Sequence, residues 1–389
     1  MKNIKHTVSS SAPSHRLDYS NAHRIAYLFY SQVMTAHGTC DKSQLRRCLI
    51  FSLYHLSTTV NLSICNIWME TFDNIYLIPK KSSLNTDLLK FINNPTRLLK
   101  SRERVEFYKT IEEINRIAAQ SDLPIILFDI GGYFAPHIGD LLERYGNRLT
   151  LILEDTTNGH IRYKELGYST LHRFRSVAYD SHKMAENVMV ANITLGYLHS
   201  FIEDWSPAKA TLVIGYGKIG RSLCFGLRSR GVQNIVVVDT DKSRLFMAST
   251  EGFEARSSEQ LEGRVDHFHY CFSMSGNRGT TKKILTTLKH NSYIVVVTSY
   301  DDEFDESTRR LFEKGDRNQL NWKGKIFNVV NGGRPINLST YAAFDPRNLS
   351  LHFIFGKIFS VFLSSLGLPQ SHSWEEITYA SIINEVKIL

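Results

Sequence analysis

A glycine-rich turn between an apolar strand and a helix constrains this chain more than any other feature. The run 210–221 reads ATLVIGYGKIGR, in which Gly215, Gly217 and Gly220 form the pattern G-x-G-x-x-G. In this pattern the first glycine permits a tight turn, the second lets the backbone approach a pyrophosphate, and the third lets helix and strand pack closely. Because the N-terminus of the helix then faces the phosphates, the run predicts a dinucleotide-binding Rossmann domain.

An acid at the end of the next strand supports this prediction. An apolar strand at 234–238 ends on Asp239. This is about 20 residues after the glycines, where a carboxylate can accept hydrogen bonds from both ribose hydroxyls of the adenosine half. The acid favours NAD over NADP because it would repel a 2′-phosphate, but Lys242 and Arg244 follow it and leave NADP as an alternative. A glycine-tolerant turn in another α/β protein is the alternative explanation of the whole pattern.

Length and composition predict a globular protein of two domains. The chain has 389 residues, which is too many for one ordinary core. Its hydrophobic content of 42% and charged content of 22% are typical of globular proteins. The chain has no apolar run long enough to predict a membrane span. Residues 1–20 are polar and lack the apolar core of a secretory signal, so we expect a disordered tail and a cytoplasmic location.

The charge and cysteine patterns argue against two other classes of function. The net charge of +8 is mild for this length, and we find no nucleic-acid-binding module with interleaved aromatic residues. We interpret Arg173, Arg175 and the basic residues at 97–104 as a solvated face or as an attraction for anionic small molecules. The five cysteines show no C-x-x-C spacing, so we expect free thiols, with Cys224 and Cys271 buried, and no metal site.

Strands that alternate with helices predict an α/β fold with a mainly parallel sheet in each of two domains. Besides the strand before Gly215, the expected strands are 74–78, 123–129, 149–153, 234–238, 266–272, 293–298 and 325–330. The expected helices are 87–92, 103–120, 181–202, 222–228 and 349–366. We predict a tail at 1–20, a substrate domain at 21–190 plus 346–389, and an NAD-binding Rossmann domain at 191–345. Helix 181–202 is long enough to bridge the two domains, and helix 349–366 would return to the first.

Five motifs, in this order, resemble those of the S-adenosylhomocysteine hydrolase family. They are DTTNG at 155–159 for its E-T-T-T-G, GYGKIG at 215–220 for its G-Y-G-x-V-G, DTD at 239–241 for its E-x-D, SMSG at 273–276 for its T-x-T-G, and GRPINL at 333–338 for its G-R-x-x-N-L. The resemblance spans about 55–362 and implies a substrate domain, a hinge helix and an NAD domain. Members of this family bind NAD tightly, oxidise a ribose 3′-hydroxyl, eliminate or add at C5′, and reduce the sugar again.

The resemblance also implies roles for individual residues. Thr156 and Thr157 would contact the nicotinamide ribose, and Asn337 would hold the carboxamide of the nicotinamide. His55 lies in a run similar to the family's H-M-T and would aid proton transfer near C5′, although a lone histidine in an apolar segment is more often structural. Asp180 matches the acid that binds the ribose hydroxyls. The expected cofactor-binding set is Thr156, Thr157, Gly215, Gly217, Lys218, Ile219, Gly220, Asp239, Ser275, Gly276 and Asn337.

The chain departs from the family mainly on the substrate side. The second acid of the family's D-D-G-G is Ile130 here, and Ser176 replaces the lysine that is thought to take the hydroxyl proton. Ser299 replaces the histidine of N-x-G-H-F-D, and the family's C-terminal tail has no counterpart after Trp374. Because each general acid or base contributes roughly 10²–10⁴-fold to a rate, we expect little hydrolysis of S-adenosylhomocysteine.

The sequence therefore favours an NAD-dependent protein that transfers a hydride, in net or transiently, on a small hydroxyl- or amine-bearing substrate such as a nucleoside. The candidate catalytic groups are His55, Asp155, Asp180 and Lys183. A solvated lysine, a turn-capping Asp155 and a helix-capping Asp180 are the structural alternatives. A non-catalytic NAD-binding regulator and a divergent hydrolase remain alternative functions. We expect a homodimer, and neither nucleic acid nor membrane as a partner.

Overall fold

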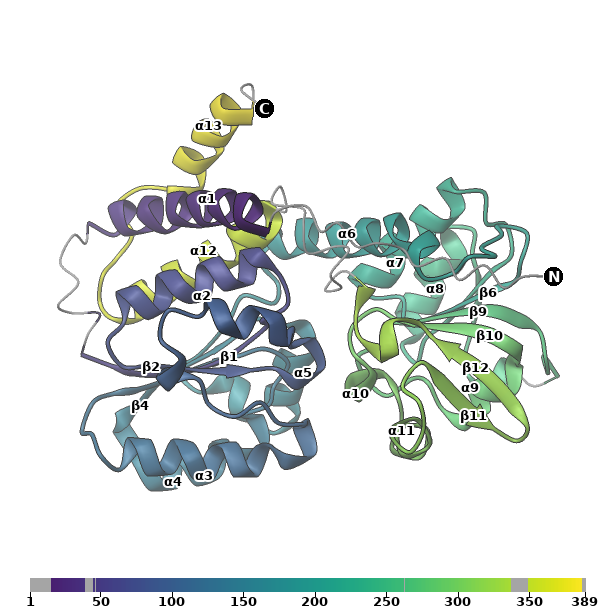
Figure 1. The fold of residues 1–389 in the computed structure, drawn as a ribbon, viewed down its shortest axis with the longest axis horizontal. Coiled ribbons are helices and arrows are strands. Elements are labelled where there is room, and N and C mark those ends of the chain that lie inside the picture. Colours follow the sequence, from purple (N-terminus) through teal and green to yellow (C-terminus); the bar gives the residue numbers. More distant parts are fainter. Residues whose placement is uncertain (1–14, 39–44, 46, 262, 337–348, 387–389) are drawn as a thin grey trace, which may run out of the picture.

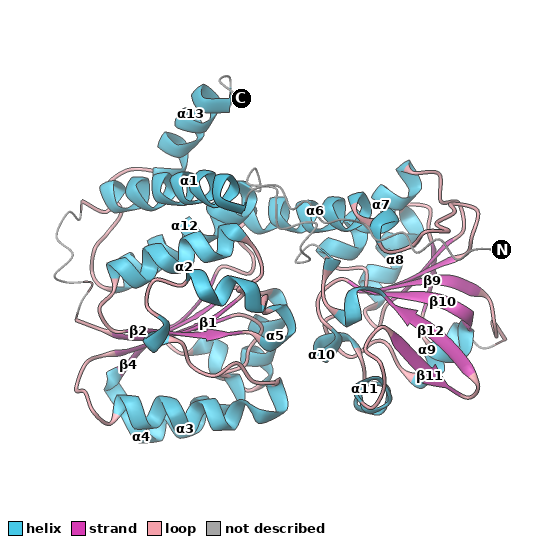
Figure 2. Ribbon diagram, viewed as in Figure 1, coloured by secondary structure: helices cyan, strands magenta, loops and turns pink. Residues whose placement is uncertain are grey.

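The chain folds into two α/β halves, each built around one mainly parallel sheet (Figures 1 and 2). The computed structural model describes residues 15–386 except 39–44, 46, 262 and 337–348. The α/β fold class with two parallel-dominated sheets is confirmed.

The first sheet has five parallel strands in the order β2-β1-β3-β4-β5. Its strands are β1 (Leu49–Tyr54), β2 (Ile75–Pro79), β3 (Ile125–Asp129), β4 (Leu149–Glu154) and β5 (Phe174–Ser176). Successive side chains of a strand point to opposite faces, so Ile126 and Phe128 join one core and Ile125 and Leu127 another. Burial on both faces explains why these strands are continuous apolar runs.

Helices cover both faces of the first sheet (Figure 1). Three of them, α1 (His15–Ala36), α2 (Thr59–Thr71) and α12 (Leu349–Ser365), share a core on one face. The other face is covered by α3 (Phe107–Ala118), α4 (Ile138–Tyr145) and α5 (Thr157–Glu165). The last helix, α13 (Trp374–Val386), packs on α1 through Trp374. Helix α12 therefore returns to the first half, as predicted from the sequence.

The second sheet has seven strands in the order β11-β12-β10-β9-β6-β7-β8, parallel except for the β11–β12 pair. Its strands are β6 (Thr211–Ile214), β7 (Ile235–Val238), β8 (Glu254–Arg256), β9 (Phe268–Ser273), β10 (Leu288–Val296), β11 (Gln319–Trp322) and β12 (Lys325–Val329). The helices of this half are α7 (Lys218–Ser229), α8 (Lys242–Thr250), α9 (Lys282–Thr287), α10 (Tyr300–Glu303) and α11 (Glu306–Glu313). Two cores, one on each face, hold them to the sheet.

A single helix, α6 (Ser181–Gly196), runs between the two halves (Figure 1). It packs on α7 of the second half and on α12 of the first. The Asp180 carboxylate caps its first turn by accepting a hydrogen bond from His182 N at 3.0 Å. The bridging role predicted for 181–202 is therefore correct, but the helix ends at Gly196 and a short 3₁₀ turn (Leu198–Ser200) follows.

Three sequence expectations can be compared with these elements. The predicted tail at 1–20 is wrong for residues 15–20, which belong to α1. Cys224 and Cys271 are free and buried, as predicted, and so are Cys48 and Cys65, whereas Cys40 lies outside the described residues. In the described part of the chain, no helix combines the length and the apolar character needed to cross a membrane.

A buried histidine in α12 should make the first half sensitive to acid. His352 is 1% exposed and stacks on Phe29 at a centroid distance of 5.4 Å, and neither ring nitrogen has a hydrogen-bond partner within the described residues. Burial lowers the pKa of His352 from 6.5 to about 3. Because the unfolded chain binds this proton more readily, stability falls as the pH drops below 6.5, by roughly 1.4 kcal/mol at pH 5.5.

We therefore expect His352→Phe to raise the urea midpoint and to reduce its loss between pH 8 and pH 5.5. The gain at pH 8 should be roughly 1–3 kcal/mol, the cost of one unsatisfied buried polar group. Parallel urea titrations at the two pH values measure both effects. An unchanged pH dependence in the variant would show that His352 does not carry the acid sensitivity.

Candidate functional site

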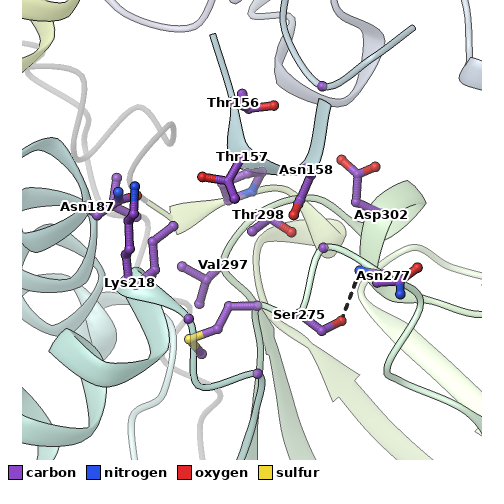
Figure 3. Close-up of a pocket in the computed structure, with 18 of the residues that line it drawn as sticks. Thr156, Thr157, Asn158, Asn187, Lys218, Ser275, Asn277, Val297, Thr298 and Asp302 are labelled. Carbon is purple, nitrogen blue, oxygen red and sulfur yellow. Dashed lines mark hydrogen bonds between the residues drawn. The ribbon is translucent and has the colours of Figure 1, made fainter. Parts of the chain in front are cut away.

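A cavity of about 640 Å³ lies between the two halves, at the ends of their strands (Figure 3). Strands β1, β2 and β4 deliver His55, Lys80 and Asp155 to its wall from the first half. Strands β6, β7, β9 and β10 deliver Gly215, Asp239, Met274 and Val297 from the second. Ligands of open parallel sheets bind at this carboxyl edge, so the cavity is the candidate functional site.

The three glycines have the geometry that the motif requires. Gly215 has φ +96°, and a Cβ there would lie 2.8 Å from the backbone of Ser275. A Cβ on Gly220 would overlap the carbonyl oxygen of Gly215, so only glycine permits this contact between α7 and the turn. Gly217 differs, because an added Cβ would face the cavity with Arg244 Nη1 at 3.9 Å as its nearest neighbour. The backbone at Gly217 is thus the part of the turn that a bound group can approach.

The helix that follows leaves its N-terminus open to the cavity. Gly217 is the N-cap of α7 and supplies no side chain to the first backbone N–H groups. Lys218 and Ile219 both line the cavity, and Lys218 Nζ donates to Ala178 O across the two halves at 2.9 Å. A helix N-terminus of this kind attracts anions such as the phosphates of a dinucleotide.

Asp239 lies at the end of β7, on the cavity wall. Its Oδ2 accepts a hydrogen bond from Tyr216 N at 2.7 Å, and its Oδ1 accepts one from Asp241 N at 2.9 Å. These bonds fix the carboxylate beside the glycine turn, where a ribose would lie. Arg244 Nη1 is 3.8 Å from Asp239 and also lines the cavity. The acid and the cation therefore adjoin each other at the position that separates NAD from NADP.

A buried glutamate organises the loop after β9. Glu303 accepts hydrogen bonds from the backbone N–H groups of Ser275 and Gly276, at 2.8 and 2.6 Å, and from the hydroxyls of Ser273, Ser275 and Thr298. A Cβ on Gly276 would overlap the Asn158 amide of the first half. Figure 3 shows Asn158 reaching toward this loop from above. The loop that carries Ser275 and Gly276 is thus held rigidly at the seam between the halves.

The loop after β4 has a similar arrangement. Glu154 accepts hydrogen bonds from the backbone N–H groups of Gly131 and Gly132 at 3.0 Å and from Thr156 N at 2.6 Å. Thr156 caps α5 by accepting from Gly159 N. Thr156 and Thr157 both line the cavity, on the side facing Ser275 (Figure 3). Each half therefore uses one buried glutamate to fix its cavity loop.

Three of the four predicted catalytic residues meet in the first-half wall of the cavity: His55, Asp155 and Lys183. Lys183 is buried and pairs with Asp155 Oδ1 at 2.8 Å and with Glu186 Oε2 at 2.5 Å. Burial disfavours its ammonium, but the two carboxylates outweigh this and raise the pKa of Lys183 above its ordinary value. Lys183 therefore stays charged at neutral pH.

His55 is a neutral imidazole. Burial lowers its pKa from 6.5 to about 3, and the positive charges of Lys80 and Lys183 add to the effect. Its Nδ1 bonds Ser83 Oγ at 2.5 Å, which leaves Nε2 as the nitrogen that a substrate could reach. The ring is therefore fixed in orientation and unprotonated at neutral pH, and it is a weak base as long as no anion offsets the charges of Lys80 and Lys183.

Two predicted site residues, Asp180 and Gly220, do not line the cavity. Asp180 is not in the cavity lining; it caps α6, contacts His182 Nδ1 at 2.7 Å and lies 3.5 Å from Lys357 Nζ. Asp180 thus has the capping role, and its role as a catalytic group stays a prediction. Gly220 lies beneath the turn and not on the cavity wall. Arg173 and Arg175 bond nearby carbonyls and do not line the cavity. Asn337 lies outside the described residues.

Sequence reasoning missed a cluster of charges across the cavity. Asp302, which follows β10, lies 3.0 Å from Arg162 Nη2, 3.1 Å from Arg104 Nη2 and 3.6 Å from Lys80 Nζ. Burial opposes its ionisation, but the three cations hold the pKa of Asp302 well below its usual range. Their positions in the sequence could have indicated this cluster, because Lys80 and Asp302 each follow a strand at the carboxyl edge of its sheet.

Comparisons with known proteins bear on the second half. Residues 211–312 match the model of the TrkA-N domain, a nucleotide-binding Rossmann domain. Among solved structures, a dipicolinate synthase component from Bacillus halodurans is 12% identical over 82% of this chain and 99% of that chain, with a TM-score of 0.46. The dipicolinate synthase structure from Bacillus subtilis is 12% identical over 84% of this chain and 99% of that chain, with a TM-score of 0.41. Residues 211–312 are thus similar to a nucleotide-binding domain of the Rossmann type that binds NAD(P).

Proposed function

We propose that this protein is an NAD-dependent oxidoreductase that transfers a hydride, in net or transiently, on a small substrate bearing a hydroxyl or an amine. One observation carries the proposal. A single cavity brings the dinucleotide turn of the second half together with His55, Asp155 and Lys183 of the first. A regulator that only binds NAD would not need a buried ammonium and a neutral imidazole at the cofactor.

The residues present fit a dinucleotide. Gly217 and the N-terminus of α7 would hold the pyrophosphate, and Asp239 would accept the ribose hydroxyls. By the family resemblance, Thr156 and Thr157 would contact the second ribose near the reacting end. Held by these residues, NAD would supply a hydride acceptor for oxidation of the substrate carbon that carries the hydroxyl or amine.

The side chains of the first half would manage the proton. His55 Nε2 can accept the proton that leaves the hydroxyl or amine as the carbon is oxidised to a carbonyl or imine. The Lys183 ammonium can donate a hydrogen bond to the substrate atom on which negative charge develops. Asp155 and Glu186 hold that ammonium in place. Lys183 is thus a charged donor and His55 the base.

The likeness to S-adenosylhomocysteine hydrolases supports the cofactor half of this proposal more than the substrate half. Ser176 stands where that family has its lysine, and it does not line the cavity. Lys183, at the start of α6, supplies an ammonium in its place. This different position of the lysine supports a different substrate rather than hydrolysis of S-adenosylhomocysteine.

We further propose that the protein forms a homodimer and is located in the cytoplasm.

The first test is the state of the bound cofactor. We expect mass spectrometry of the purified protein to find NAD, and absorbance to show reduced nicotinamide after addition of a substrate from a panel of hydroxy acids, amino acids and nucleosides. His55→Asn should keep the dinucleotide and slow the reduction roughly 10²-fold or more. Bound NAD that stays oxidised with the whole panel would favour the regulator, and absence of any dinucleotide would overturn the proposal.

Cofactor choice is expected to depend on Asp239. Asp239→Ala should weaken NAD binding roughly 10- to 100-fold, because hydrogen bonds to a charged group contribute about 1.5–3 kcal/mol. NADP binding should weaken less or improve, since Arg244 loses its carboxylate neighbour. Titrations of both dinucleotides measure the change. Asp241→Asn is the matched control, because it removes a negative charge two residues away but keeps the cap of α8.

A further inference from the structure

We infer that the substrate carries a carboxylate, which binds a basic subsite of Lys80 and Arg162 on the first-half wall of the cavity, beside His55. The inference rests on the proposed function and names its substrate class. Lys80 and Arg162 both line the cavity and share one carboxylate, that of Asp302.

The subsite is built from the first half. Lys80 follows β2, and its backbone N–H donates to Tyr54 O, one residue before His55. Arg162 comes from α5, and its guanidinium bonds the carbonyl of Gly131. Both side chains line the cavity. Arg104 stands behind them, bonded to Gly131 O at 3.1 Å and stacked on the Tyr133 ring with its Cζ 3.7 Å from the ring centroid.

The nearby acids do not neutralise this cluster. Among the described residues, Asp302 is the one acid that pairs with Lys80, Arg104 and Arg162, and Asp301 accepts from the Tyr133 hydroxyl at 2.8 Å. Asp129 is bonded by the backbone N–H groups of Tyr133 and Phe134 and by the Tyr163 hydroxyl. The charges of Asp301 and Asp129 act on Arg104. Positive charge therefore remains on Lys80 and Arg162, the two cations of this cluster that line the cavity.

The Lys80 ammonium has room for a second anion. Its Nζ is 3.6 Å from Asp302 Oδ2, whereas a charge-assisted hydrogen bond spans about 2.7–2.9 Å. Arg162 is held by two partners, because its Nη1 donates to Gly131 O and its Nη2 to Asp302 Oδ1, so it adds positive charge to this wall while Lys80 supplies the open donor. A substrate carboxylate would accept the charge-assisted hydrogen bond that Lys80 lacks.

Position connects the subsite to the chemistry. The Ser83 hydroxyl links the backbone of Lys80 to His55, because it donates a hydrogen bond to Lys80 O and is also bonded to His55 Nδ1. In a 2-hydroxy or 2-amino acid the reacting carbon is bonded directly to the carboxylate. Anchoring the carboxylate at Lys80 would thus bring the hydroxyl or amine next to His55 Nε2. The bound anion would also offset the Lys80 charge, which is one of the causes that keep the His55 pKa low.

The test measures binding to the NAD-loaded protein separately from reduction. The probes are lactate, malate and alanine, each compared with its neutral amide, together with adenosine and inorganic phosphate. We expect at least one carboxylate to bind ten times or more tighter than its amide by calorimetry. Lys80→Met and Arg162→Met should each remove most of that difference. Lys80→Arg should keep it, and Asp302→Asn should strengthen binding of the acid.

The results separate this inference from the proposed function. Lys80-dependent binding of a carboxylate without reduction would support the subsite and count against the oxidoreductase. Reduction by adenosine or by an amide, with carboxylates no better, would support the oxidoreductase and overturn the subsite. Tighter binding of phosphate than of any carboxylate, or equal affinity in Lys80→Met, would also overturn it. Both methionine variants leave Asp302 with two cations, so neither leaves it unpaired.

Discussion

Gly217→Ala is expected to abolish most dinucleotide binding while the protein stays folded. The added methyl would point into the cavity, and its nearest neighbour would be Arg244 Nη1 at 3.9 Å. Gly217 has φ −74°, which alanine adopts without strain. The methyl would, however, fill the space where the pyrophosphate approaches the backbone. We expect affinity for NAD to fall roughly 10- to 100-fold or more, the effect of overpacking by about 1–3 kcal/mol.

Gly220→Ala is the matched comparison, because the same methyl three residues later has the opposite consequence. It would overlap the carbonyl oxygen of Gly215, which is backbone and cannot rotate away. We expect a loss of roughly 3 kcal/mol or more in the free energy of unfolding, with NAD binding lost as a result. Urea titrations and NAD titrations of both variants measure this. Normal NAD binding by Gly217→Ala would place the dinucleotide elsewhere, and a fully stable Gly220→Ala would disprove the close packing.

The dinucleotide half was largely predictable because its signals are local. The turn, the helix and Asp239 lie within one strand–helix–strand unit, and their roles are set by backbone geometry rather than by distant partners. The buried parallel strands could also be predicted from the sequence, because burial on both faces of a sheet produces continuous apolar runs. The structure therefore brings Gly215, Gly217 and Asp239 to one cavity, although some strands have other bounds, as β10 (Leu288–Val296) has against the expected 293–298.

The substrate half was less predictable because its charges come from distant segments. Lys80 and Asp302 are far apart in the chain, and no local pattern indicates which loop of one half faces which loop of the other. Asp180 was hard to interpret because its local pattern is ambiguous. An acid before a helix is typical both of a helix cap and of a ligand-binding group, and only the structure shows that Asp180 caps α6 and does not line the cavity.

Several helices were not predicted, and two of them, α2 and α1, were missed for different reasons. Helix α2 is buried along nearly its whole length, so its sequence lacks the polar face that marks an amphipathic helix. Helix α1 buries Ala22, Ala26, Phe29, Val33 and Ala36, a spacing of four and three residues that does predict a helix. The polar composition of residues 1–20 predicted a tail, but a helix can begin in polar sequence when its apolar stripe starts later.

Lys183→Met is expected to cost both stability and catalysis. The substitution leaves Asp155 and Glu186 beside each other without their shared cation. Removing one partner of a buried ion pair typically costs about 3–5 kcal/mol. Urea titration should show this loss directly. Lys357→Met is the matched control, because Lys357 also lies between two carboxylates, Asp180 at 3.5 Å and Glu375 at 3.3 Å, but its side chain is 29% exposed, compared with 7% for Lys183. We expect it to cost about 1 kcal/mol or less.

A triple variant separates the two roles of Lys183. Lys183→Met combined with Asp155→Asn and Glu186→Gln removes the cation and both charges that required it, so most of the lost stability should return. Hydride transfer should nevertheless remain slower by roughly 10²–10³-fold, because the hydrogen-bond donor for the developing charge is absent. The absorbance of reduced nicotinamide under single-turnover conditions measures this rate. A stable triple variant that reduces NAD at the normal rate would show that Lys183 only balances its two carboxylates, and the hydrogen-bond donor would then have to be another group of the cavity.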